Sequence, residues 1–148
     1  MLRPIWFYFD AQRFGKPEAV IKGILCIGNP AIFWMIPVAI GYLIWDFCKR
    51  RAWASGLVLL GFFTQWLPYA FFGRLKFFHY FYTAMPFVAM ALALLLSRLW
   101  AWGKPGRVIV VLYLILVAGM FVYWYPLLTA LPVSGKFFQH HMWFKKWI

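Results

Sequence analysis

The chain has 148 residues, of which 66% are hydrophobic and 24% aromatic, so it is far more apolar than a soluble domain, which is roughly half apolar. Its 15 Lys and Arg residues face only three acidic residues, and the formal net charge is +12. These cations lie in short gaps between apolar runs, where anionic lipid headgroups are nearer counterions than nucleic acid. We therefore expect a lipid bilayer as a partner and no nucleic acid.

Four runs contain no Asp, Glu, Lys or Arg and reach the length of about 20 residues that a membrane helix needs: 23–45, 52–73, 77–97 and 108–135. They predict an all-α, multi-pass integral membrane protein with four transmembrane helices at about 30–47, 52–73, 77–97 and 108–126. The module 23–126 then follows an interfacial juxtamembrane segment, 1–22, and precedes an interfacial tail, 127–148.

Local signals mark the first helix. Because proline restricts the residue before it, the pair Asn29-Pro30 predicts a helix that begins at Pro30, with Asn29 as its cap. Pro37 is a candidate kink inside that helix. Asp46 lies four residues before Arg50, a spacing that favours a local ion pair over a catalytic role.

Later segments carry weaker signals. Gln65 is costly against lipid, so we expect it to face other protein or a cavity. Residues 97–107 contain Gly-Lys-Pro-Gly and predict a loop, and the segment from Phe137 onward predicts a short interfacial helix. His140 and His141 are adjacent and should point apart on that helix, so we expect no metal site there.

The stretch 69–86, YAFFGRLKFFHYFYTAMP, joins two apolar runs across a very short polar gap. Arg74 offers a fork of donors and Lys76 a point charge to a phosphate, and His79 and Tyr80 can donate to the same oxygens. The alternative is that Arg74 and Lys76 are interface cations whose charged ends reach water. The first interpretation predicts a binding site for a phosphate-bearing lipid.

No motif of a soluble enzyme occurs: GxGxxG, GxSxG, HExxH and the Walker loop are all absent, and we predict no cofactor. Sugar transfer to a hydroxyl needs a general base, commonly a carboxylate. The sequence offers only Asp10, Glu18 and Asp46, none in a supporting constellation. We therefore predict no catalytic residue in this chain.

An ordered set of segments resembles one family. LRPIWFYF, IGNPAIFW, RLKFFHYFYTAMPF and YPLLTALPVS, followed by a Trp-rich end, are similar to the carboxy-terminal four-helix module of the protein O-mannosyltransferases. The resemblance covers essentially the whole chain. Arg74, His79, Tyr80 and Pro86 of the third segment and Asn29 of the second match the family's motifs.

The resemblance implies a fold of the C superfamily of glycosyltransferases, and a mannose transfer from polyprenyl- or dolichyl-phosphate mannose to Ser or Thr of an acceptor protein. It implies the plasma membrane in bacteria or the endoplasmic reticulum in eukaryotes, with both termini extracytoplasmic. Counted by charge alone, the positive-inside rule favours the opposite orientation. The family's acidic motif lies in an amino-terminal half, which implies that this chain is a fragment, a split subunit or a truncated reading frame.

Two alternatives stay open. The chain could be a non-catalytic membrane-anchoring module whose basic hairpin binds anionic lipids. It could also belong to a related transferase of the same superfamily that moves another sugar to another acceptor.

Overall fold

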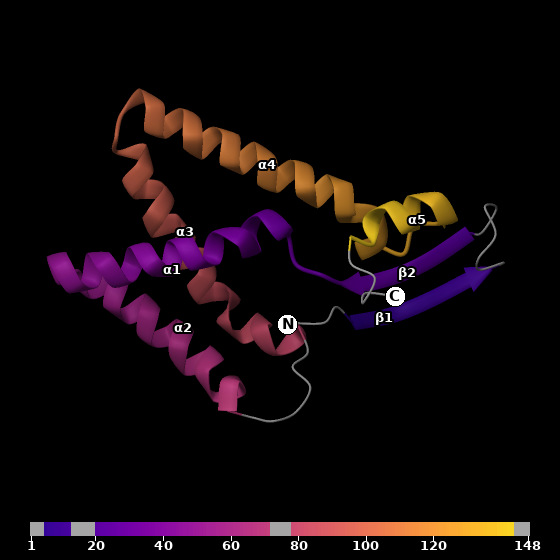
Figure 1. The fold of residues 1–148 in the computed structure, drawn as a ribbon, viewed down its shortest axis with the longest axis horizontal. Helices are drawn as coiled ribbons and strands as arrows, with labels where there is room; N and C mark the ends of the chain where they lie inside the picture. Colours follow the sequence, from indigo (N-terminus) through magenta and orange to yellow (C-terminus); the bar gives the residue numbers. More distant parts are fainter. Residues whose placement is uncertain (1–4, 13–19, 72–77, 144–148) are drawn as a thin grey trace.

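The structure is a computed structural model that describes residues 5–12, 20–71 and 78–143. A bundle of long helices makes up one part of the molecule, and an antiparallel sheet with a short helix extends from one end of it (Figure 1). In chain order the elements are β1 (Ile5–Gln12), β2 (Val20–Cys26), α1 (Pro30–Arg50), α2 (Trp53–Phe71), the 3₁₀ helix η1 (Phe78–Ala84), α3 (Met85–Trp100), α4 (Lys104–Leu128), β3 (Val133–Ser134) and α5 (Gly135–His141).

The prediction that the protein is all-α is wrong for its amino-terminal segment. Residues of the predicted segment 1–22 and the first residues of the run after it form the antiparallel pair β1–β2, and β3 adds to β2 to give the order β1-β2-β3. On β2, Ile21 and Leu25 are buried while Val20 and Lys22 are exposed, a period of two that belongs to a half-buried strand. The apolar face of β2 therefore has to pack against other elements.

Helix α1 begins at Pro30, with Asn29 in an extended conformation before it, as the Asn29-Pro30 pair predicts. The helix continues through Pro37 and ends at Arg50, and its C-cap residue Arg51 has a φ of 51°, in the left-handed region. Helix α2 then begins after two residues. The connection between α1 and α2 is therefore very short.

The third and fourth helices differ from their predicted bounds. The expected helix at 77–97 is divided into η1 and α3, and Pro86 lies in the first turn of α3, where its missing N–H costs nothing. The expected loop at 97–107 is wrong, because Pro105 likewise opens α4 and only 101–103 separate the two helices. Gly103 makes the tight turn with a φ of 89°.

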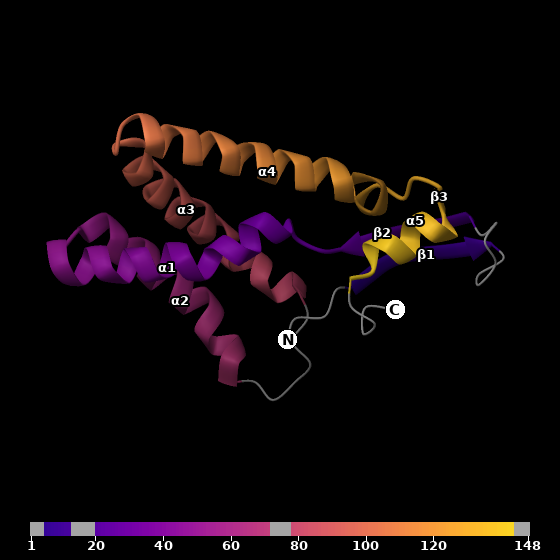
Figure 2. The same ribbon diagram turned by 45° about the horizontal axis from the view of Figure 1, so that its top comes forward.

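In the described part of the chain, buried apolar side chains form two separate cores. The larger one lies among α1, α2, η1 and α3 and includes Leu43, Phe62, Phe81 and Val88. The smaller one joins the sheet to the end of α4 and to α5, around Trp124 and Leu127. Helices α1 and α3 pack on each other in the middle of the bundle, with α2 on one side and α4 on the other (Figure 2).

Among the described residues, three helical segments are long and apolar enough to cross a membrane: Pro30–Arg50, Phe81–Trp100 and Lys104–Leu128. Helix α2, which contains Thr64, Gln65 and Pro68, is not one of them. The structure therefore supports an integral membrane protein with three candidate spans.

The short helix of the tail is α5, which begins at Gly135, two residues before the predicted start, and is capped by Ser134. His140 is exposed and His141 is buried, so the two histidines point apart, as expected. The part of the predicted interfacial helix beyond residue 143 lies outside the described residues.

Candidate functional site

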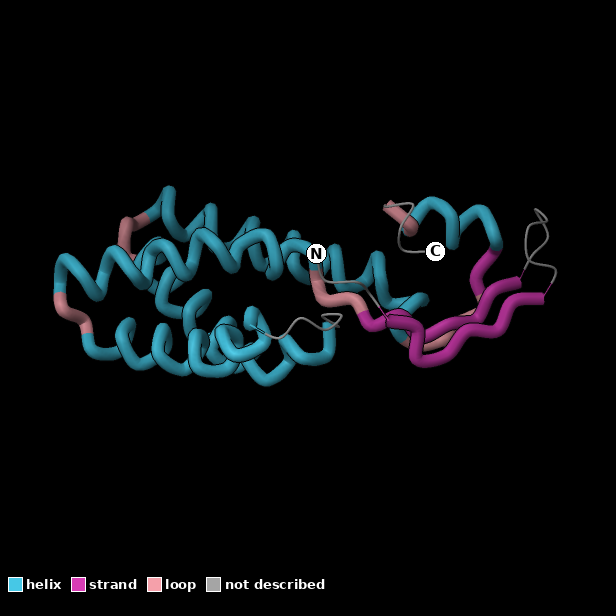
Figure 3. Tube along the Cα trace, turned by 60° about the horizontal axis from the view of Figure 1, so that its bottom comes forward, coloured by secondary structure: helices cyan, strands magenta, loops and turns pink. Residues whose placement is uncertain are grey.

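The segment that carries the predicted residues His79 and Tyr80 lies at the end of the bundle that carries the sheet, here called the sheet end. Helices α1 and α3 start there and α2 and α4 return to it, while the turns at 51–52 and 101–103 lie at the opposite end, here called the turn end (Figure 3). The predicted residues Arg74 and Lys76 lie outside the described residues. His79 and Tyr80 belong to η1, whose backbone is placed at the sheet end.

Neighbouring side chains fix the position of η1. Phe81 is buried, and its ring lies 5.5 Å from that of Phe33 on α1 and 6.2 Å from that of Phe62 on α2. The hydroxyl of Tyr82 is 3.0 Å from the sulfur of Cys26, at the end of β2. These contacts hold the segment that contains His79 and Tyr80 against the junction between the sheet and α1.

Asn29 joins two helices at this junction. Its side-chain oxygen accepts a hydrogen bond from the Ala31 N–H at 3.0 Å, which caps α1. Its side-chain nitrogen donates to the Val117 carbonyl of α4 at 2.8 Å. One amide therefore satisfies a free N–H of α1 and ties α1 to α4, 88 residues away along the chain.

His141 forms a second junction, which the sequence did not reveal. Only 1% of its surface is exposed, and its two ring nitrogens lie 2.8 Å from the Phe137 carbonyl and 3.1 Å from the Tyr123 carbonyl. The rings of Tyr123 and Phe137 stack on it at 4.0 Å each. The Phe137–His141 spacing of four residues was visible in the sequence, but the contact with Tyr123 depends on how α5 folds back onto α4.

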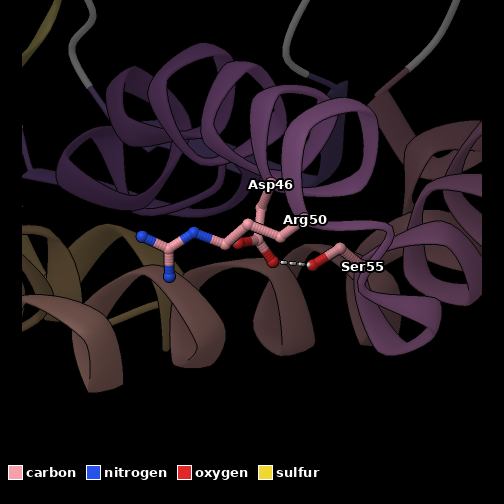
Figure 4. Close-up of polar contacts among 3 residues, drawn as sticks. All are labelled: Asp46, Arg50 and Ser55. Carbon is pink, nitrogen blue, oxygen red and sulfur yellow. Dashed lines mark hydrogen bonds and ion pairs between the residues drawn. The ribbon is translucent and has the colours of Figure 1, made fainter.

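The described carboxylates do not form a catalytic pair. Asp46 lies at the turn end, where the Ser55 hydroxyl donates to it at 2.7 Å and Arg50 is 3.8 Å away, which confirms the predicted local ion pair (Figure 4). Asp10 is exposed on β1, opposite Lys22 in the sheet register. Glu18 lies outside the described residues. Within the described ranges, no three His, Cys, Asp or Glu side chains gather where they could hold a metal ion.

Fold and composition define the class of this protein: a helical module of an integral membrane protein, with a small sheet and a ring-rich junction at one end. The family model described as the C-terminal four TMM region of protein-O-mannosyltransferase matches residues 1–147. The chain belongs to this family, and the resemblance seen in the sequence is confirmed.

Named relatives agree with this assignment. The chain is 31% identical over 156 residues to the polyprenol-phosphate-mannose–protein mannosyltransferase of Mycobacterium tuberculosis (strain CDC 1551 / Oshkosh), covering 99% of this chain and 30% of that protein. It is 30% identical to the protein of the same name from Mycolicibacterium smegmatis (strain ATCC 700084 / mc(2)155), with 99% and 30% covered. The Corynebacterium glutamicum protein is 32% identical, with 84% of this chain and 25% of that protein covered.

The chain thus spans less than a third of the length of these relatives. No solved structure gives a significant match.

Proposed function

We propose that this chain is the donor-side, carboxy-terminal part of a membrane glycosyltransferase. In this proposal the enzyme transfers mannose from polyprenyl-phosphate mannose to Ser or Thr hydroxyls of an acceptor protein. The chain contributes contacts to the donor phosphate and its lipid and leaves the catalytic carboxylate to another part of the enzyme. The observation that carries the proposal is the family match over residues 1–147, together with relatives named for that donor and for protein mannosylation.

The sheet end supports a donor site built around Arg74, Lys76, His79 and Tyr80. The backbone of η1 belongs to this end, and Cys26, Phe33 and Phe62 hold its last residues in place through Tyr82 and Phe81. A rigid frame matters because a phosphate contact that must order its own segment loses part of its binding energy to that ordering. Arg74 and Lys76 then supply the charge for the phosphate.

The proposal that the catalytic base comes from elsewhere rests on the surroundings of the carboxylates. Asp46 is buried at the turn end, where Ser55 and Arg50 engage it. If α1 crosses the bilayer, about 30 Å of hydrocarbon separates Asp46 from the sheet end. Asp10 faces Lys22 in the sheet register. A general base for the acceptor hydroxyl is therefore expected in the region that the longer relatives carry outside the match.

The same proposal sets the topology and the membrane. We propose four spans, with α2 as the span beyond the three candidates, in a fold of the C superfamily of glycosyltransferases. The sheet end and both termini then lie on the extracytoplasmic side of the plasma membrane in a bacterium, or in the lumen of the endoplasmic reticulum in a eukaryote. The turn end lies in the cytoplasm.

The test is Arg74→Ala in native membranes, where the chain is present together with the rest of the proposed enzyme, with a photoreactive polyprenyl phosphate as the probe. Loss of a charge-assisted contact costs about 1.5–3 kcal/mol, so we expect labelling affinity to fall about 10- to 150-fold and mannose transfer to a Ser/Thr peptide to fall with it. Arg98→Ala removes the same charge at the turn end and is the matched control, with labelling unchanged. Equal labelling of the Arg74 variant and the native chain contradicts the site.

The anchoring alternative has one observation in its favour. At the turn end, Arg50 lies 5.2 Å over the Trp45 ring and Arg107 lies 5.6 Å over the Trp100 ring, an arrangement suited to a membrane interface. A module that only anchors needs a positive charge but no particular arrangement of hydrogen-bond donors. Arg74→Lys should then keep its affinity for anionic lipid, and that affinity should fall as ionic strength rises. A donor site loses affinity in Arg74→Lys. Mass spectrometry of the acceptor separates a mannosyltransferase from a relative that moves another sugar.

A further inference from the structure

We infer that the outer face of α2 is the docking surface for a further membrane helix that presents a polar side chain to Gln65. The helix belongs to the part of the mannosyltransferase that the relatives carry outside the matched region, whether in the same polypeptide or in a separate one. The inference rests on the proposed function for the identity of this partner, and on α2 as a membrane span. The face consists of Trp53, Leu57, Leu60 and Thr64, with Gln65 at its edge.

The two outer helices of the bundle have different exposed faces. On α4 the exposed side chains are aliphatic or aromatic over several turns, among them Leu112 at 60%, Ile115 at 62% and Val122 at 69% exposure. An entirely apolar surface of this kind can contact lipid directly and needs no protein partner. On α2, Leu57 and Leu60 are exposed to 65% and 62%, but Thr64 and Gln65 interrupt the apolar surface on the next turn.

Of these two polar side chains, only the amide lacks a partner. The Thr64 hydroxyl bonds to the carbonyls of its own helix, at 2.8 Å to Leu60 and 3.0 Å to Gly61. Gln65 makes no hydrogen bond with any described residue and is exposed on α2. An amide that offers two N–H groups and a carbonyl to hydrocarbon costs several kcal/mol, so it needs a polar group opposite.

A protein helix fits this face better than a water-filled cavity. Water could satisfy Gln65, but Leu57 and Leu60 on the adjoining turns would then also face that water. An apolar helix with one amide or hydroxyl side chain covers the leucines and pairs with Gln65 at once. The relatives have the length to supply such a helix, because the matched region makes up only 30% of the Mycobacterium tuberculosis protein.

The test places a benzophenone amino acid at position 60 of α2 or, as the matched control, at position 115 of α4, in the native gene product within its own membranes. After irradiation, mass spectrometry identifies what each position has captured. We expect position 60 to capture a peptide from an apolar segment of a mannosyltransferase polypeptide, and position 115 to capture lipid. Lipid alone at position 60, or position 60 of a second copy of this chain, overturns the inference.

The amide itself is tested by Gln65→Leu, with Thr64→Val as the control. Hydrogen bonds between membrane helices average about 0.6 kcal/mol, so we expect the protein product at position 60 to fall about threefold in Gln65→Leu and to be unchanged in Thr64→Val. An unchanged yield in Gln65→Leu assigns the surface to apolar packing and refutes the role of the amide. If Arg74→Ala keeps its donor labelling while position 60 still captures a helix, the donor site fails and the docking surface stands.

Discussion

The two ends of the bundle are built from contacts of different range along the chain. At the turn end, Asp46 bonds to Ser55 nine residues later. At the sheet end, Asn29 reaches Val117 across 88 residues and Cys26 reaches Tyr82 across 56. The turn end is therefore closed by local sequence, whereas the sheet end exists only when distant segments have assembled.

This difference bears on the proposal that the sheet end holds the donor site. A turn closed by neighbouring residues holds two helices together but brings few kinds of side chain to one place. The sheet end gathers a strand end, a 3₁₀ helix, the last turns of α4 and the tail, and its groups are held by partners from other elements. Such an assembly holds side chains from several distant segments in fixed positions, as the proposed donor site requires.

The strongest test of this comparison is His141→Ala at the sheet end. The substitution removes a buried ring between Tyr123 and Phe137, together with the contacts of its two ring nitrogens with the Phe137 and Tyr123 carbonyls. We expect the free energy of unfolding in detergent micelles to fall by about 3 kcal/mol, and trypsin to cut sooner at Lys136. His140→Ala, at the exposed neighbour, should change stability by less than about 0.5 kcal/mol. If His141→Ala and His140→Ala lose equal stability, the buried contacts of His141 do not stabilise the sheet end.

Asn29 makes one local and one long-range hydrogen bond, and substitutions can test the contribution of each to stability. Asn29→Ala loses both the cap of α1 and the bond to the Val117 carbonyl, and we expect a loss of about 2 kcal/mol in the same unfolding measurement. Asn29→Asp keeps an oxygen for the cap but loses the donor that faces Val117. If Asn29→Asp is as stable as the native chain, the long-range bond contributes nothing and only the local cap matters.

Features that depend on local contacts could be predicted from the sequence, whereas features that depend on long-range contacts could not. The start of α1 and the Asp46–Arg50 pair depend on neighbouring residues, and both were predicted correctly. The sheet was missed because an aromatic, basic segment is also typical of a membrane interface. The alternation of apolar residues in β2 indicates a strand only once α4 and α5 are known to cover its buried side. The His141 junction depends on the packing of α5 against α4, so no local signal specified it. The proposed phosphate groups Arg74 and Lys76 remain predictions from residue type and family resemblance.

The smallest expected effect is at the turn end, where the two contacts of Asp46, with Ser55 and with Arg50, can be removed one at a time. The Ser55–Asp46 hydrogen bond is buried and short, at 2.7 Å, whereas the Arg50–Asp46 pair spans 3.8 Å and the guanidinium side chain is 45% exposed. We expect Ser55→Ala to cost about 1 kcal/mol of unfolding free energy and Arg50→Ala less than about 0.5 kcal/mol, because solvent screens an exposed pair. Raising the salt concentration should reduce only the Arg50 effect. A larger loss in Arg50→Ala than in Ser55→Ala would mean that the ion pair, and not the buried hydroxyl, holds this turn.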